Sequence, residues 1–208
     1  MKIRIIGDVH GKVYQYLPLT KDCDYSIQLG DVGFKKHYNF LDRMEYDKNK
    51  HFFIPGNHDD YDNLPEYALG DFGTLKFYRE DHTYDHNSEM FWVRGAFSVD
   101  HRLRREGIDW WRDEELNHNE ANKALETFAN SKPETVLSHD CPAEILPYVL
   151  TDDRKIRPSH TCKMLQEMWK IHQPRRWFFA HHHQSKKVKI NRTNFICLNE
   201  LEAYDIEC

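Results

Sequence analysis

Residues 3–11 read Ile-Arg-Ile-Ile-Gly-Asp-Val-His-Gly, a short apolar run that stops at a polar turn between glycines. The same pattern recurs at residues 25–31, Tyr-Ser-Ile-Gln-Leu-Gly-Asp, and at residues 51–59, His-Phe-Phe-Ile-Pro-Gly-Asn-His-Asp. Each apolar run has four or five residues and is rich in Ile, Phe or Tyr, which is typical of buried strands. The three stretches therefore predict three strands, each followed by a polar turn.

The segment between the second and third runs predicts a helix over residues 36–50, because Phe40, Leu41 and Met44 recur at helical spacing. Strand, turn, helix and strand in this order form the βαβ unit of a parallel sheet. In such sheets, ligands gather at the carboxyl ends of the strands. We therefore expect all three polar turns to lie together at that end of the sheet.

The rest of the chain predicts a mixture of short strands and amphipathic helices. Apolar runs predict strands at 75–78, 82–84, 91–97, 135–137 and 177–180. Amphipathic patterns predict helices over 114–130 and 162–172. The last three runs predict an antiparallel meander at 186–190, 195–198 and 203–206. The mixed strand order favours an α/β fold, a four-layer sandwich of two sheets flanked by helices in one domain over residues 1–208.

The composition of the chain limits which classes of ligand and which cellular compartment we expect. The formal net charge of −5 provides no overall basic field that would attract nucleic acid, although it does not exclude a local basic groove. Five scattered cysteines without a CxxC pair are typical of reduced thiols in a cytosolic protein. The first apolar run is too short for a signal peptide, and no run approaches the roughly 18 apolar residues of a membrane span. We therefore expect a cytoplasmic protein that does not bind membranes.

Polar clusters follow five of the predicted strands. They are Asp8-Val9-His10, Asp31, Asn57-His58-Asp59, His139-Asp140 and His181-His182-His183. A single strand-ending Asp or His is often only a turn former or a structural residue. Five clusters at successive strand ends instead favour one shared site. Carboxylates and neutral imidazoles suit divalent ions such as Mn, Fe, Co and Zn.

The spacing within these clusters suggests which side chains share an ion. At the end of a strand, residues i and i+2 can point to the same side, so Asp8 and His10 can reach one ion. The same argument predicts that His181 and His183 point to the ions, whereas His182 points to the opposite side. A carboxylate with two oxygens can bridge two ions, the arrangement suited to in-line attack at phosphorus. Flanking glycines, among them Gly30 and Gly56, allow the backbone to turn sharply beside the ions.

In order and approximate spacing, the motifs resemble the signature of the calcineurin-like metallophosphoesterase superfamily. The matching stretches are Gly7-Asp8-Val9-His10-Gly11, Gly30-Asp31, Gly56-Asn57-His58-Asp59, His139 and His181-His182-His183. The resemblance implies a two-sheet sandwich flanked by helices and two divalent ions, Mn first, with Fe, Zn, Ni or Co as alternatives. It implies a first metal bound by Asp8, His10 and His183, and a second bound by Asn57, His139 and His181.

The same resemblance implies the catalytic roles. Asp31 would bridge the metals together with a water or hydroxide that attacks the phosphate ester. His58 would face the scissile phosphate and assist the leaving group, as a histidine that titrates near working pH can do. Asp59 has two alternatives, to orient His58 or to cap a following helix.

Two departures from the family pattern bear on the substrate. Ala180 stands where the family usually has Gly, a small change if φ is negative there. The phosphoprotein phosphatase branch has an arginine beside its second motif and another beside its third. Both are absent here: the second motif continues to Phe34 without an arginine, and Pro55 precedes the third. Because such arginines clamp phosphate, their absence weakens the case for a protein Ser/Thr phosphatase. The sequence is compatible with a phosphodiesterase, a nucleotidase or a less selective phosphatase.

The sequence contains less information about the substrate than about the metal ligands. Arg94 and Arg102, on the segment after the 91–97 run, are candidates for bidentate phosphate binding, or they belong to a solvated charged loop. We expect a small phosphorylated substrate or nucleotide. The alternatives are a non-catalytic protein-binding scaffold on the same fold and a nucleic-acid-binding module. Scaffold members usually lose ligands or the catalytic histidine, and this chain retains all of them.

Overall fold

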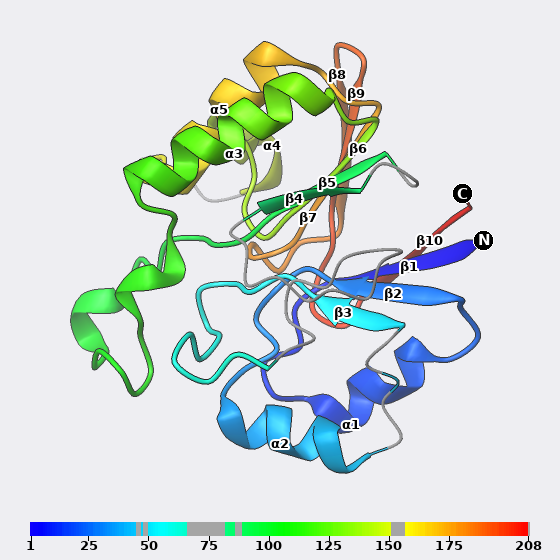
Figure 1. The fold of residues 1–208 in the computed structure, drawn as a ribbon, viewed down its shortest axis with the longest axis vertical. Helices are drawn as coiled ribbons and strands as arrows, with labels where there is room; N and C mark the ends of the chain where they lie inside the picture. The colour runs from blue at the N-terminus through cyan, green and yellow to red at the C-terminus, as the bar shows by residue number, and fades with distance from the viewer. Residues whose placement is uncertain (45–46, 48–49, 66–81, 86–88, 151–156, 208) are drawn as a thin grey trace.

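The computed structural model describes residues 1–44, 47, 50–65, 82–85, 89–150 and 157–207. In this part of the chain two β-sheets lie face to face, and helices cover the outer face of each (Figure 1). The layers follow the order helices, sheet, sheet, helices, which confirms the predicted α/β sandwich. None of the helices in the described ranges has the length and apolarity that a membrane crossing requires.

The first sheet has the strand order β10-β1-β2-β3. Its strands are β1 (Lys2–Ile6), β2 (Tyr25–Gln28), β3 (His51–Phe53) and β10 (Ala203–Glu207). The first three run parallel, as the sequence predicts, and β10 pairs antiparallel with β1. The outer face carries α1 (Val13–Tyr16) and α2 (Lys35–Arg43), with a 3₁₀ turn, η1, at Leu17–Thr20.

Helix α2 is shorter than predicted. It ends at Arg43, and Met44 adopts an extended conformation with φ −90° and ψ 166°. Residues 45–50, Glu-Tyr-Asp-Lys-Asn-Lys, are mostly charged or polar, so further helical turns would bury little apolar surface. The sequence does not predict α1, because four residues are too few to show a helical period.

The second sheet has the strand order β4-β5-β6-β7-β9-β8. Its strands are β4 (His82–Asp85), β5 (Met90–Val93), β6 (Thr135–Ser138), β7 (Arg176–Phe179), β8 (Lys186–Ile190) and β9 (Thr193–Cys197). The four central strands run parallel, and the edge strands β4 and β8 run antiparallel to their neighbours. The strand predicted at 75–78 lies outside the described residues.

Helices α3 (His118–Ser131), α4 (Leu146–Val149) and α5 (His160–Ile171) cover the second sheet (Figure 1). Helix α3 begins later than the predicted residue 114, because the Asn117 side chain accepts from the backbone N–H groups of Asn119 and Glu120 and caps the helix there. Short 3₁₀ turns complete the described elements: η2 (His101–Leu103), η3 (Arg112–Glu114) and η4 (Ala143–Ile145).

The predicted terminal meander is wrong in its last strand. Strands β8 and β9 form an antiparallel hairpin, but β10 leaves this sheet and pairs with β1 in the other one. Ile206 of β10 packs into the core between the sheets, and Asp205 forms an ion pair with Arg4 at 2.6 Å. The alternation of residues 203–206 predicts a half-buried strand, but it contains no information on which sheet edge the strand joins.

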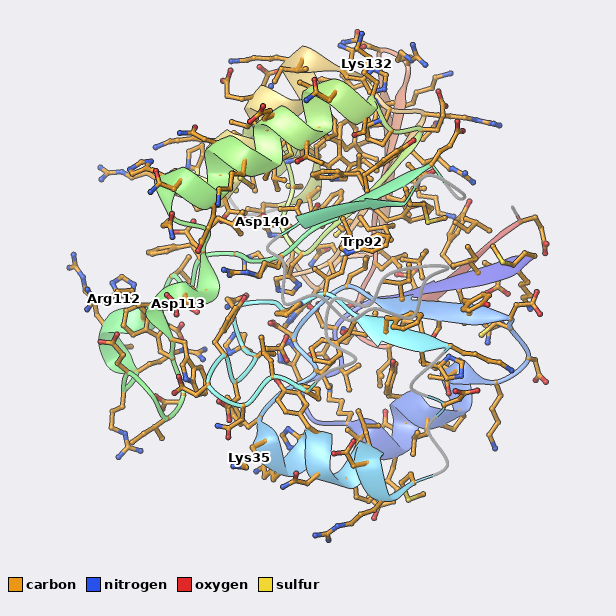
Figure 2. All side chains as sticks on the ribbon, viewed as in Figure 1. Lys35, Trp92, Arg112, Asp113, Lys132 and Asp140 are labelled. Atoms are coloured by element: carbon orange, nitrogen blue, oxygen red, sulfur yellow. The ribbon has the colours of Figure 1, made fainter. Side chains whose placement is uncertain are left out.

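Three apolar clusters fill the boundaries between layers. The cluster between the sheets includes Ile3, Ile5, Leu137 and Phe178, together with Trp92, which Figure 2 shows between the two sheets. The other two clusters lie beneath the helices on each outer face. Packing on both faces fixes the ends of β1, β2, β3, β6 and β7, so the loops that follow them start from rigid positions.

Candidate active site

The loop after β1 and the loop after β7 bring together the first group of candidate ligands. Asp8, His10 and His183 each offer a ligand atom within 4.8 Å of the other two. Nε2 of His10 lies 2.9 Å from Nε2 of His183, which lies 3.1 Å from Asp8 Oδ2. Asp8 Oδ2 is buried and makes no hydrogen bond of acceptable geometry in the described part of the chain. A cation among these three atoms would satisfy it.

The loops after β2, β3, β6 and β7 bring together the second group. Asp31, His139 and His181 offer ligand atoms within 4.8 Å of one another. Asn57 joins them, because its Oδ1 lies 3.1 Å from His139 Nε2. Nδ1 of His139 lies 2.6 Å from the carbonyl oxygen of Leu29. A proton on Nδ1 would be donated to that carbonyl, which leaves the Nε2 lone pair directed into the group, as in histidines that bind metals.

Asp31 lies between the two groups. Its Oδ1 is 3.3 Å from Nε2 of His139, and its Oδ2 is 3.7 Å from Nε2 of His10. The two oxygens of one buried carboxylate thus face one imidazole of each group. This is the position that a bridging ligand requires.

Four candidate ligands have a left-handed backbone. The φ angles are +47° at His10, +60° at Asp31, +62° at His181 and +50° at His183. Non-glycine residues rarely adopt this region, and such strain persists where the surrounding structure enforces it, often at functional sites. His181 and His183 each offer a ligand atom to one of the two groups through this left-handed turn and not through the alternation of an extended strand. Ala180, which precedes them, has no positive φ, so its methyl group is tolerated.

The amide of Asn57 is oriented by a chain of hydrogen bonds that the sequence does not reveal. Its Nδ2 donates to Ser98 Oγ at 3.0 Å, which turns Oδ1 toward His139. The Ser98 hydroxyl donates to the buried Glu114 carboxylate at 2.6 Å, and the Ser98 backbone N–H donates to its other oxygen at 2.8 Å. Burial raises the pKa of Glu114, although the bonds from Ser98 act in the opposite direction.

Asp59 has neither of the two roles considered for it. Its carboxylate accepts from the backbone N–H groups of Asp31 at 2.7 Å, of Gly56 at 2.8 Å and of Gly33 at 2.8 Å. The hydroxyl of Tyr38 donates to it at 3.1 Å. Asp59 therefore ties the loops after β2 and β3 together, beneath the candidate ligands.

Gly56 makes room for the second group. A Cβ at this position would overlap Asp31 Oδ1 and lie 2.6 Å from His139 Nε2. We therefore expect Gly56→Ala to weaken metal binding and to lower the free energy of unfolding by about 1 to 3 kcal/mol, because two candidate ligands must shift. Metal titration and chemical denaturation measure the two effects.

The matched control for that substitution is Gly107→Ala. There the added carbon meets only Asp62 Oδ2, at 4.0 Å, far from the candidate ligands. Its positive φ of +75° predicts some loss of stability but unchanged metal affinity. Equal metal affinity in both variants would contradict the packing argument for Gly56.

His58 lies at the edge of the first group. Its backbone N–H donates to Asp31 Oδ1 at 2.7 Å, and its ring centroid lies 5.3 Å from that of His10. Its ring also contacts Arg104, whose Nη1 is 2.6 Å from His58 Nδ1. Arg104 Nε donates to Asp100 Oδ1 at 2.8 Å, which fixes the guanidinium against the imidazole.

The two predicted phosphate-binding arginines differ in their surroundings. Arg94 is buried: its Nη1 donates to the carbonyl oxygen of Asp113, and its guanidinium covers the ring of Tyr61, 5.1 Å from the ring centroid. Its Nη2 also lies 3.6 Å from a carboxylate oxygen of Glu120. Arg102 is exposed on η2. Among the arginines of residues 94–105, the contact with His58 belongs to Arg104, which sequence spacing does not distinguish from its neighbours.

Charge in the site is distributed between buried carboxylates and imidazoles. Burial alone would raise the pKa of Asp31, but His139, His58 and His10 lower it overall, so this carboxyl group is ionised. Burial alone would lower the pKa of His139, whereas the Asp31 and Asp8 carboxylates raise it to about 10. Burial lowers the pKa of His181 to about 4, which keeps this imidazole neutral and available as a ligand.

A family model for calcineurin-like phosphoesterases matches residues 1–185. The chain belongs to this family. It is accordingly a metal-dependent hydrolase of phosphate esters, which confirms the resemblance noted in the sequence. The calcineurin-like phosphoesterases depend on a dinuclear metal centre, and the two ligand groups joined by Asp31 fit such a centre in donor type and position.

Solved structures show the same fold at low sequence identity. A protein from Thermus thermophilus matches with a TM-score of 0.58 and 13% identity, over 96% of this chain and 89% of its own. A dimetal phosphatase from Danio rerio matches with a TM-score of 0.56 and 12% identity, over 97% of this chain and 88% of its own. No curated protein matches this calcineurin-like phosphoesterase.

Proposed function

We propose that the protein hydrolyses a small phosphorylated substrate with two divalent cations, Mn first among the candidates. One cation would be held by Asp8, His10 and His183, and the other by Asn57, His139 and His181. Asp31 would bind both cations. The observation that carries the proposal is the place of Asp31 between the two groups, with one oxygen toward His10 and the other toward His139. Two such cations would supply an activated water near neutral pH and offset charge on the phosphoryl oxygens.

His58 would protonate the leaving oxygen. Its backbone bond to Asp31 places the imidazole beside the bridging carboxylate, at the edge of the site where a substrate can enter. Burial lowers the pKa of His58, Asp31 raises it and Arg104 lowers it. An anionic phosphate beside the ring would favour the protonated form that donates to the leaving group.

Arg104 is the arginine that we assign to the substrate phosphate. Its guanidinium contacts His58 and is oriented by Asp100 and by the carbonyl oxygen of Asp109, so Nη2 lies beside the imidazole at the point where His58 acts. A guanidinium binds phosphate oxygens bidentately, which an amide does not reproduce. This position compensates for the missing arginines of the protein phosphatase pattern.

We expect Arg104→Gln to lower kcat/KM for a phosphate ester by on the order of 10- to 100-fold, because a charge-assisted contact to phosphate is lost. Steady-state kinetics at saturating Mn²⁺ measure the change. Arg192→Gln is the matched control, because Arg192 is exposed beside Glu134, at the opposite end of β6 from His139, and it should stay within about twofold of the wild type. Equal losses in the two variants would contradict the assignment.

The activity is tested with p-nitrophenyl phosphate and bis(p-nitrophenyl) phosphate, each with Mn²⁺ and with a chelator. Metal-dependent turnover of the first compound favours a phosphatase or nucleotidase, and turnover of the second a phosphodiesterase. The Danio rerio neighbour is a dimetal phosphatase, so phosphate monoesters and mononucleotides come first in the wider panel. No metal-dependent turnover across that panel would reject the proposal and favour the scaffold alternative.

A further inference from the structure

A third cluster of metal-ligating side chains lies on the loops that hold the second group. Asp140 and Cys141 directly follow His139, and His182 lies between His181 and His183. One ligand atom from each of Asp140, Cys141 and His182 lies within 4.8 Å of the other two. Figure 2 shows Asp140 beneath the helices that cover the second sheet. None of these three side chains belongs to the two groups joined by Asp31.

The distances within this cluster fit a single tetrahedral ion. Cys141 Sγ lies 3.6 Å from His182 Nε2, which lies 3.1 Å from Asp140 Oδ1. With zinc–sulfur bonds of about 2.3 Å and zinc–nitrogen or zinc–oxygen bonds of about 2.0 Å, tetrahedral ligands lie roughly 3.3 to 3.6 Å apart. The two separations from His182 are therefore close to those of zinc ligands before any side chain moves, and a ligand oxygen of Asp140 lies within 4.8 Å of the Cys141 sulfur.

The Asp140 carboxylate is oriented for this role by its neighbours. The backbone N–H of Cys141 donates to Oδ1 at 2.8 Å. The thiol of Cys162 donates to the other oxygen, Oδ2, at 3.0 Å, and the Ser159 hydroxyl lies 3.5 Å from it. These contacts direct Oδ1 toward His182 and leave Cys162 on the far side of the carboxylate, outside the three-ligand group.

Charge and burial also favour a divalent ion. Asp140 and Cys141 are buried, and the His182 side chain is 8% exposed. One carboxylate and one thiolate with a neutral imidazole neutralise a charge of +2, which avoids an uncompensated buried charge. A thiolate with an imidazole suits Zn²⁺ better than Mn²⁺, whereas the thiol-free groups around Asp31 accept either.

We propose that Asp140, Cys141 and His182 bind one Zn²⁺, separate from the dinuclear centre and connected to it through the backbone. Binding releases the Cys141 thiol proton to solvent and forms one zinc–sulfur bond. The ion links the loop that carries His139 to the loop that carries His181 and His183. It thereby holds the two loops together from outside the two groups joined by Asp31.

Cobalt tests the site through a signal that the dinuclear centre does not produce. Thiolate–Co²⁺ coordination gives an intense near-ultraviolet charge-transfer band, and no cysteine belongs to the two groups around Asp31. We expect the band in cobalt-loaded wild type and its loss in Cys141→Ser. Cys197→Ser, which removes another buried thiol on the neighbouring strand, should retain it.

A second measurement does not depend on a folded variant. X-ray absorption at the zinc edge of the wild-type protein should show a sulfur neighbour at about 2.3 Å. Cobalt-loaded wild type without the charge-transfer band, or zinc-loaded wild type without the sulfur shell, would overturn the proposal, as would a band that persists in folded Cys141→Ser. Both readouts are independent of turnover, so failure of the proposed hydrolysis would leave them interpretable.

Discussion

Asp31→Asn is expected to lower kcat for phosphate-ester hydrolysis by at least about 100-fold at saturating Mn²⁺. The carboxylate places one oxygen 3.3 Å from His139 Nε2 and the other 3.7 Å from His10 Nε2. An amide offers one oxygen and one N–H₂ group, so it cannot serve both groups with negatively charged oxygen. Kinetics with the two p-nitrophenyl esters, together with the metal content of each sample, measure the loss.

The control for this substitution is Asp24→Asn. Asp24 is exposed just before β2 and accepts from the backbone N–H of Lys2 at 2.8 Å, so only the amide change is shared with the test variant. Its kcat should stay within about twofold of the wild type, as for other exposed sites. Wild-type kcat and metal content in Asp31→Asn would remove the basis for a bridging role.

Asp59→Ala is expected to lower the free energy of unfolding by about 3 to 5 kcal/mol, because several buried donors lose one shared acceptor. The substitution leaves the backbone N–H groups of Asp31, Gly33 and Gly56 without their acceptor in the interior. Each unsatisfied buried donor costs free energy, and the loops after β2 and β3 lose their common partner. Guanidinium unfolding followed by circular dichroism measures the loss.

Tyr38→Phe is the comparison for Asp59→Ala, because it removes fewer of the hydrogen bonds around Asp59. It removes the 3.1 Å bond from the Tyr38 hydroxyl to Asp59 and the 3.1 Å bond that this hydroxyl accepts from the Asp60 backbone N–H, but it leaves the three backbone donors to Asp59 satisfied. We expect a loss of about 2 kcal/mol, the usual contribution of two hydrogen bonds. If the two variants lost equal stability, Asp59 would not be the residue that joins these loops.

The sequence predicts the fold well where residue type changes abruptly along the chain. Each apolar run of β1, β2 and β3 is followed at once by glycine or proline and an acid or amide, so strand and loop are distinguishable. The sheet to which β10 belongs is not predictable in the same way, because pairing with β1 depends on contacts between the two ends of the chain. Local periodicity specifies which face of a strand is buried, not which strand lies beside it.

The candidate ligands follow from short motifs, whereas the residues around them depend on the path of longer loops. His10, Asp31 and His139 stand within four residues of the ends of β1, β2 and β6, so the positions of the strands bring them together. Arg104 reaches His58 only because residues 98–114 fold back across the site, and no local pattern separates it from Arg102. Asp59 has a clear position in its motif, but its partners are backbone N–H groups, which carry no sequence signal.

The pairing of β10 with β1 has a consequence for synthesis. Lys2 stands opposite Glu207 in the register, so the two partners are 205 positions apart in the sequence (207 − 2) and are synthesised far apart in time. Until β10 emerges, the edge of β1 exposes unpaired N–H and C=O groups, which are a template for pairing with other chains. The first sheet is therefore completed only after β10 has been synthesised, and nascent chains that still lack β10 are the most exposed to aggregation.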